Sequence, residues 1–142
     1  MRKAIVAEAH RWLEVPYKLG GSSREGIDCS HLARKCLQAA GLKIVAWCDW
    51  LFLNMPVIRP LKLLEPGDLA FFNLKEGRTP GRLIRHVGID IGNQRMIHAC
   101  SRAGRVIKSS YNSSDLEHLV AVEERTEVMI QQWLKEIIQP PP

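Results

Sequence analysis

The sequence has no CxxC pair, no run of five or more like charges and no apolar stretch long enough to cross a membrane. Its four cysteines are therefore expected to be free thiols, at least three of them small buried residues, and not a disulfide framework. The most apolar segment, residues 43–58, is interrupted by Asp49, Asn54 and Pro56. These absences exclude a disulfide-stapled scaffold and a membrane-spanning helix, and no nucleic-acid partner is expected.

What is present is the composition of one globular domain. In 142 residues, 46% are hydrophobic and 25% are charged, which is enough to build a core without staples. We expect a single domain over residues 1–139 and a disordered tail at residues 140–142. The excess of 20 Lys and Arg over 15 Asp and Glu gives a net charge of +5, which favours an anionic partner.

The hydrophobic period changes once along the chain. Helical spacing predicts a first helix that ends before Pro16, a second that begins at Cys29 and stops at Gly41, and a last one from about Thr126, whose apolar columns are interpreted as core. Short strands are predicted at residues 69–74, 86–91, 95–99, 105–108 and 119–122. Residues 43–60 have no clear period. Helices followed by an antiparallel sheet indicate an α+β fold.

One cysteine and two histidines stand where a thiol hydrolase needs them. Cys29 lies in the first turn of the second predicted helix, and a helix N-terminus or a neighbouring imidazolium lowers the pKa of a thiol. His86 opens an apolar strand, where its ring needs a polar partner. His98 stands in the next strand across a hairpin, close enough to orient the His86 ring. This order predicts a nucleophile, a base and an orienting partner for acyl transfer.

Several short motifs in one order and spacing resemble the NlpC-type cell-wall peptidases, which are papain-like cysteine hydrolases. The similarity covers about residues 12–125. It is carried by Pro16-Tyr17-Lys18-Leu19-Gly20-Gly21, Asp28-Cys29-Ser30, Leu64-Glu65-Pro66-Gly67-Asp68-Leu69, His86-Val87-Gly88-Ile89-Asp90-Ile91-Gly92-Asn93 and Met96-Ile97-His98-Ala99.

The resemblance implies a fold and a set of roles. The fold would be papain-like, with N-terminal helices on a five- to six-stranded antiparallel sheet and a C-terminal helix. Cys29 would be the nucleophile, His86 the general base and His98 the third member. Tyr17 would lie near the oxyanion site, although it could equally be a packing aromatic. No cofactor is implied.

The resemblance also implies a substrate. It would be a peptidoglycan stem peptide or muropeptide, cleaved between D-γ-glutamate and a diamino acid, with Asp28 and Ser30 helping to hold its free amine. Two residues depart from the family pattern: His31 replaces a small residue, and Asp90 replaces an aromatic one. Residues 75–85 form an insertion whose arginines are hypothesised to contact substrate carboxylates; they are Arg78, Arg82 and Arg85.

Other interpretations of the same residues stay open. The scaffold could carry a thiol acyltransferase or amidase with another substrate, or a catalytically silent module that binds cell-wall peptides. Zinc is a further interpretation, with four cysteines and histidines as its ligands: Cys29, His31, His98 and Cys100. Their spacing matches no common zinc motif, and no metal is expected. The remaining cysteines and histidines are interpreted as core (Cys36, Cys48) and surface (His10, His118).

The location expected for such an enzyme depends on how it reaches the wall. Two positive charges open the chain, but Glu8, His10 and Arg11 end any apolar run, so we expect an amphipathic helix and not a signal peptide. The expectation is therefore a cytoplasmic protein that processes recycled muropeptides, delivery by a phage tail or a contact-dependent secretion machine, or export by a non-classical route. Removal of an earlier export signal is the further alternative.

Overall fold

The centre of the structure is a five-stranded antiparallel sheet built from β3 (Leu69–Leu74), β4 (His86–Gly92), β5 (Arg95–Cys100), β6 (Arg105–Ser110) and β7 (Leu119–Ala121). The strand order is β6-β5-β4-β3-β7. The computed structural model describes residues 1–44 and 47–138, so the predicted tail at residues 140–142 lies outside the described residues. A separate two-stranded ribbon, β1 (Ser22–Ser23) with β2 (Gly26–Ile27), precedes the sheet.

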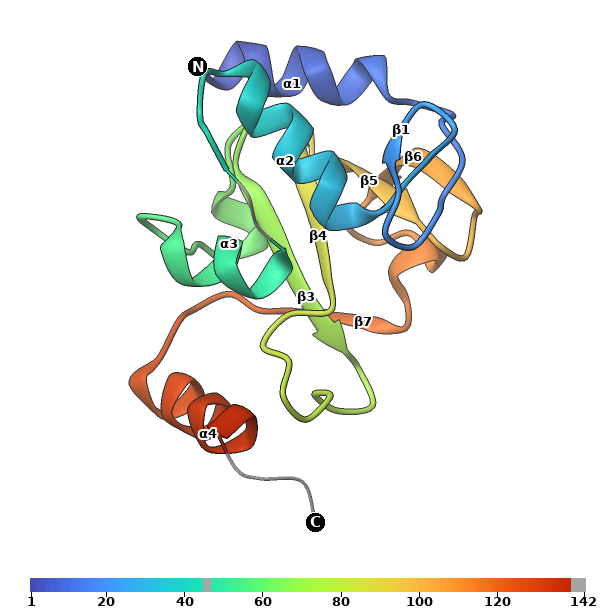
Figure 1. The fold of residues 1–142 in the computed structure, drawn as a ribbon. Coiled ribbons are helices and arrows are strands. Elements are labelled where there is room, and N and C mark those ends of the chain that lie inside the picture. Colours follow the sequence, from blue (N-terminus) through green and yellow to red (C-terminus); the bar gives the residue numbers. More distant parts are fainter. Residues whose placement is uncertain (45–46, 139–142) are drawn as a thin grey trace.

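The described residues form four α-helices besides the sheet: α1 (Arg2–Arg11), α2 (Cys29–Ala39), α3 (Cys48–Asn54) and α4 (Glu127–Ile138). Figure 1 shows α1 and α2 crossing over one side of the sheet, α3 beside β3 and α4 set apart at the far end. Both α1 and α2 pack against each other and against β4. This is the predicted α+β fold, with the helices first and the antiparallel sheet after them. Within the described residues no helix is both long and apolar enough to span a bilayer.

The second helix starts where the sequence predicts. Asp28 has an extended backbone and its carboxylate accepts the N–H of His31, which makes it the N-cap of α2. The helix ends at Ala39, and Gly41 then takes a positive φ of 89°. Its inward face buries Leu32, Ala33, Cys36 and Leu37. Cys29 is thereby held in the first turn, at the positive end of the helix dipole.

Alternation along the strands divides the sheet into two faces. Val87, Ile89 and Ile97 lie in the main core with the helices, whereas Phe72 and Met96 belong to a smaller cluster on the other face. Gly88 is needed for this packing, because a Cβ at that position would collide with the side chain of Met96. His86 and His98 have the parity of Met96, so they project from the face opposite the main core.

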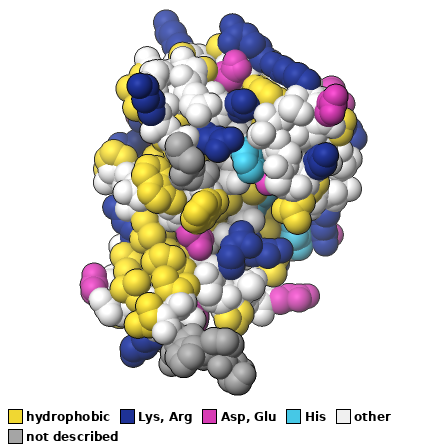
Figure 2. Space-filling model, in the orientation of Figure 1, with side chains coloured by type: hydrophobic (Ala, Val, Ile, Leu, Met, Phe, Trp, Pro, Cys, Tyr) yellow, Lys and Arg dark blue, Asp and Glu magenta, His cyan; other side chains and the backbone are white. Residues whose placement is uncertain are grey.

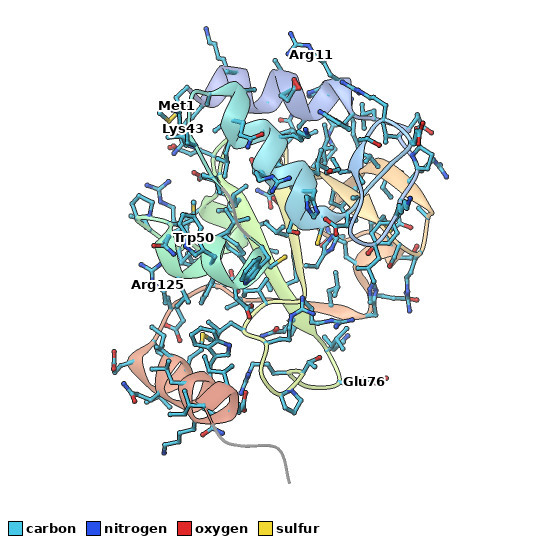
Figure 3. The ribbon with its side chains drawn as sticks, viewed as in Figure 1. Met1, Arg11, Lys43, Trp50, Glu76 and Arg125 are labelled. Atoms are coloured by element: carbon cyan, nitrogen blue, oxygen red, sulfur yellow. The ribbon has the colours of Figure 1, made fainter. Side chains whose placement is uncertain are left out.

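The segment without a clear period contains the seven-residue helix α3, which the sequence did not predict. Its Asp49 is buried and accepts the backbone N–H groups of Leu83 (3.0 Å) and Ile84 (2.8 Å). At its other end the Arg125 guanidinium lies against backbone carbonyls that include those of Phe52 and Met55. Figure 3 labels Arg125 on the chain that passes below α3. Such a short helix depends on these tertiary contacts because isolated short helices are unstable.

The interpretation of the C-terminal apolar columns as core is wrong in part. No residue of α4 is buried; Val128 is 80% exposed and Ile138 is 73% exposed, while only Met129 and Trp133 pack partly against the core. Figure 2 shows the resulting apolar surface over α4 and the neighbouring α3. Because α4 lies beside the loop between β3 and β4 and not over the sheet, only one side of it finds apolar partners.

Candidate active site

A pocket of about 240 Å³ opens where the first turn of α2 meets the start of β4 and the end of β5. Its lining includes Tyr17, Cys29, His86 and His98. The structure thus brings the predicted nucleophile, base, orienting histidine and oxyanion tyrosine into one pocket from a loop, a helix and two strands. A concave site with a thiol and an imidazole in it is the arrangement expected for nucleophilic chemistry.

The two histidines form a hydrogen-bonded chain that ends at a serine. Nε2 of His86 lies 2.7 Å from Nδ1 of His98, and Nε2 of His98 lies 2.8 Å from Oγ of Ser109. The two rings meet edge to face, with an interplanar angle of 82°. Since His86 uses Nε2 for His98, its Nδ1 is the ring nitrogen left for the thiol. Ser109 was missed because the strand was predicted to end at residue 108.

Burial sets the protonation of His98. Its side chain is only 1% exposed, and burial, together with the charges of His86 and His118, lowers its pKa to about 3. His98 is therefore neutral at neutral pH and carries one ring proton. When His86 is protonated, its Nε2–H donates to Nδ1 of His98, and His98 in turn donates from Nε2 to Ser109. The chain fixes both the orientation and the tautomer of the pair.

Cys29 has the environment of a thiolate. Its Sγ lies 3.8 Å from Sγ of Cys48, the first residue of α3. Hydrogen bonding from Cys48 lowers the pKa of Cys29 well below its usual value; burial opposes this, and His86 and the N–H of Val87 lower it further. The same contact raises the pKa of Cys48, which is buried and stays a thiol. Cys48 is thus a core residue, as predicted, but it also touches the candidate nucleophile.

Asp28, Ser30 and His31 form a network at the helix start, beside the pocket and outside its lining. One oxygen of Asp28 accepts from the His31 ring (2.7 Å) and the Ser30 hydroxyl (3.2 Å), and the other accepts the N–H of Gly20 (2.8 Å). Burial raises the pKa of Asp28, but the N–H groups and the ring of His31 lower it overall. The network ties the glycine turn to α2, and the predicted roles of these residues toward substrate stay predictions.

Tyr17 contributes a hydroxyl to the pocket. Its backbone is fixed by a hydrogen bond to the carbonyl of Gly104 (2.9 Å), and its ring packs partly on the core. Burial raises the pKa of the phenol, and the negative charges of Cys29 and Asp28 raise it further. Tyr17 therefore stays protonated and available as a hydrogen-bond donor beside the thiol.

The rim of the pocket is basic. Arg85 and Arg102 line it, together with Asp115 and His118. His118, which is predicted to be a surface residue, is half-buried at this rim. Of the three arginines in residues 75–85, Arg85 alone is part of the lining. Arg78 instead forms a two-pronged ion pair with Glu136 of α4, at 2.8 and 2.5 Å. This contact holds the loop to the C-terminal helix.

Of the residues considered for zinc, Cys29, His98 and Cys100 line the same pocket, whereas His31 lies outside it. The His31 ring turns to Asp28, and Sγ of Cys100 accepts the N–H of Ala103. Across residues 1–44 and 47–138, no group of three or more Cys, His, Asp or Glu side chains is arranged to hold a metal ion.

Residues 14–124 match the NlpC/P60 family. The chain belongs to this family. It is 33% identical over 124 residues to a Haemophilus influenzae protein named "Probable endopeptidase", covering 80% of this chain and 68% of that one. It is also 33% identical over 111 residues to the Escherichia coli protein named "Murein DD-endopeptidase MepS/Murein LD-carboxypeptidase", covering 77% of this chain and 55% of the relative.

Solved structures agree with this NlpC/P60 assignment. The NlpC/p60 domain of the peptidoglycan hydrolase SagA superposes with a TM-score of 0.67 at 28% identity, covering 88% of this chain and 99% of that one. The family resemblance and the papain-like α+β fold predicted from the sequence are both confirmed. This NlpC/P60 chain spans 55% of the E. coli relative, so the activity of that whole protein does not transfer to it directly.

We expect Cys29 to react with iodoacetamide at pH values well below 8.5, which is about the pKa of an ordinary cysteine thiol. Replacing His86 (His86→Ala) removes the cation that stabilises the thiolate, so the midpoint of the alkylation rate against pH should rise. A rise of about 2 units lowers the rate about a hundredfold at pH values below the wild-type midpoint. Mass spectrometry of the Cys29 peptide gives the rate. The exposed His10 (His10→Ala) is the matched control, and a wild-type midpoint near 8.5 would contradict a preformed thiolate.

The buried neutral His98 should make the fold acid-sensitive. Its pKa is about 3 in the folded chain and about 6.5 when unfolded, so between these values only the unfolded chain binds the proton. The free energy of unfolding should therefore fall with falling pH, by about 1.4 kcal/mol per unit. Urea denaturation at pH 6.5 and at pH 5 gives the free energy of unfolding that each protein loses between the two. This loss should be about 2 kcal/mol smaller in His98→Gln than in wild type or in the exposed control His10→Gln. Equal losses in all three would mean that His98 is protonated in the fold.

Proposed function

We propose that this chain is a cysteine peptidase that hydrolyses an amide bond in peptidoglycan stem peptides. The proposal rests on one observation. Cys29, His86 and His98 line one pocket, and a chain of hydrogen bonds runs from His86 through His98 to Ser109. The names of the relatives, endopeptidase and peptidoglycan hydrolase, support the choice of substrate. A thiol with a depressed pKa beside an oriented imidazole is the arrangement that amide hydrolysis by acyl transfer requires.

In the proposed first step, the Cys29 thiolate attacks the amide carbonyl and the carbonyl oxygen becomes an oxyanion. The N–H of Cys29 at the start of α2 and the Tyr17 hydroxyl are the donors placed for that charge, because Asp28 already caps the N–H of His31. The C–N bond then breaks as the protonated His86 gives its Nδ1 proton to the leaving amine. A thioester on Cys29 remains.

In the proposed second step, His86 acts as base. It takes a proton from water, the hydroxide attacks the thioester, and the Cys29 thiolate leaves as the carboxylic acid product forms. His98 and Ser109 hold the ring of His86 in place through both steps, and the neutrality of His98 keeps a second positive charge out of the pocket. The protons balance, because the one donated to the amine is regained from water.

The charged rim supports a substrate with carboxylates. Arg85 and Arg102 stand beside the thiol and the base, and arginine pairs well with carboxylate groups. Stem peptides carry such groups next to the D-γ-glutamyl–diamino acid bond, which is the bond we propose. The name of the E. coli relative favours a second candidate, the D,D-peptide cross-link between stem peptides. The two bonds lie at different places in a muropeptide and give products of different mass.

Digestion of defined muropeptides separates these possibilities. Wild type, incubated with disaccharide tripeptide, tetrapeptide and a D,D-cross-linked dimer, should release the fragment cut after D-γ-glutamate. Removing the thiolate (Cys29→Ala) should lower the rate at least about a thousandfold, and His86→Ala should do the same, since each removes a reacting group. Mass spectrometry of the products identifies the bond.

The outcomes of that digestion exclude one another. Monomers released from the dimer alone would move the assignment to the cross-link. No cleavage, but transfer of an acyl group from Cys29 to an added amine, would favour an acyltransferase. Retained muropeptide binding with an inert Cys29 would leave a silent binding module.

Arg85 should recognise a substrate carboxylate. Its removal (Arg85→Ala) should raise KM about tenfold or more with little change in kcat, since a lost charge-assisted hydrogen bond costs about 1.5–3 kcal/mol. Arg95 is exposed at the far end of β5, so Arg95→Ala is the control and should leave KM unchanged. Arg78→Ala should also leave it unchanged, because Arg78 is bound to Glu136. Steady-state kinetics on the cleaved muropeptide decide, and an unchanged KM for Arg85→Ala would remove it from substrate recognition.

A further inference from the structure

The sulfur atoms of Cys29 and Cys48 are in van der Waals contact at 3.8 Å, although the two residues start different helices. A disulfide has a bond length of about 2.05 Å, so closing one would bring the sulfurs together by about 1.8 Å. This is a small movement for two side chains at the first turns of their helices. The mechanism proposed above makes no covalent use of Cys48.

The two thiols differ in access. Cys29 is partly exposed and lines the pocket, whereas Cys48 is only 4% exposed. A small oxidant that enters the pocket therefore meets Cys29 first. Cys29 also has the lower pKa of the two, and a thiolate is the form of cysteine that reacts with peroxides. One sulfur is thus placed to be oxidised, and the other is placed behind it.

The remaining cysteines are placed differently. Cys36 is fully buried two turns further along α2, and burial, aided by the charge of Glu8, raises the pKa of its thiol to about 12. Cys100 is buried and its sulfur accepts the N–H of Ala103. In the part of the chain that the structure describes, Cys48 is the cysteine whose sulfur contacts that of Cys29.

We propose that Cys29 and Cys48 form a reversible oxidative modification site, in which a hydroperoxide oxidises Cys29 and Cys48 then closes a disulfide with it. In the first step the Cys29 thiolate attacks one peroxide oxygen, the O–O bond breaks, and the products are the Cys29 sulfenic acid and hydroxide or alkoxide. The Cys48 sulfur then attacks the Cys29 sulfur, the S–O bond breaks, and the released hydroxide takes the Cys48 proton to give water.

The disulfide would switch the enzyme off and protect it. The two thiols together lose two electrons to the peroxide, and a dithiol restores both by exchange. While the bond lasts, Cys29 cannot attack substrate, and it also cannot be oxidised further to the irreversible sulfinic acid. The proposal rests on the reactive Cys29 of the proposed function but on no particular substrate.

Tryptic peptide mapping tests the site directly, because trypsin separates all four cysteines. Cleavage after Lys and Arg gives peptides 25–34 with Cys29, 36–43 with Cys36, 44–62 with Cys48 and 96–102 with Cys100. Purified full-length chain is treated with hydrogen peroxide at pH 7, quenched with N-ethylmaleimide and digested without reductant. We expect peptide 25–34 joined to 44–62, with the loss of two hydrogens, and its release by dithiothreitol.

Matched variants test the role of Cys48. After peroxide and then dithiothreitol, wild type and Cys36→Ala should recover most of the iodoacetamide-reactive Cys29 they had before treatment. Cys48→Ala, or Cys48→Ser if the first fails to fold, should recover at least about fivefold less and carry two added oxygens on peptide 25–34. Each recovery is scaled to the same variant before oxidation, and peroxide treatment of each variant continues until its Cys29 no longer alkylates, so a change in basal reactivity does not enter.

Three results would overturn the proposal: no 25–34 to 44–62 link while Cys29 still alkylates readily, equal linking of 25–34 to 36–43, or equal recovery in Cys48→Ala and wild type. None of these measurements uses muropeptides. A failure of the proposed peptidase activity would therefore leave the test of the thiol pair intact.

Discussion

The site depends on the pairing register of β4 and β5. Ile89 is paired with Ile97, which sends both isoleucines into the main core and leaves His86 and His98 together on the opposite face. A shift of one residue would exchange the faces and place an imidazole in the apolar core. The hydrophobic pattern that folds the sheet is therefore also what sets the 2.7 Å contact between the two rings.

The helix α3 connects the two halves of the pocket. Its first residue, Cys48, touches Cys29 on α2, and its second, Asp49, binds the backbone of Leu83 and Ile84 just before β4 begins. The half that carries the thiol and the half that carries the base are thus positioned against one short element. Its buried carboxylate is satisfied by backbone N–H groups, which is how a charge is tolerated at that depth.

Local patterns predicted most of the fold and three residues that the structure brings into one pocket. Cys29, His86 and His98 each lie in a short motif beside a helix start or within a strand, and their catalytic roles stay predictions. Ser109 was missed, since a serine near a strand end has no pattern of its own. The helix α3 has seven residues, too few to show a helical period, and depends on partners far along the chain. The columns of α4 favoured a core position, which is wrong in part because no pattern within a helix reveals whether a partner covers its apolar side.

The ion pair between Arg78 and Glu136 links a segment inside the family match to one outside it. Arg78 lies in the loop inserted between β3 and β4, inside the region that matches the family, whereas α4 begins at Glu127, beyond the match, which ends at residue 124. Trp133 adds a second tie, donating its indole N–H to the carbonyl of Gly81. Loop and helix thus form one accessory module. A chimera that received either part alone would inherit a loop without its ion pair, or a helix held only by its partial packing against the core.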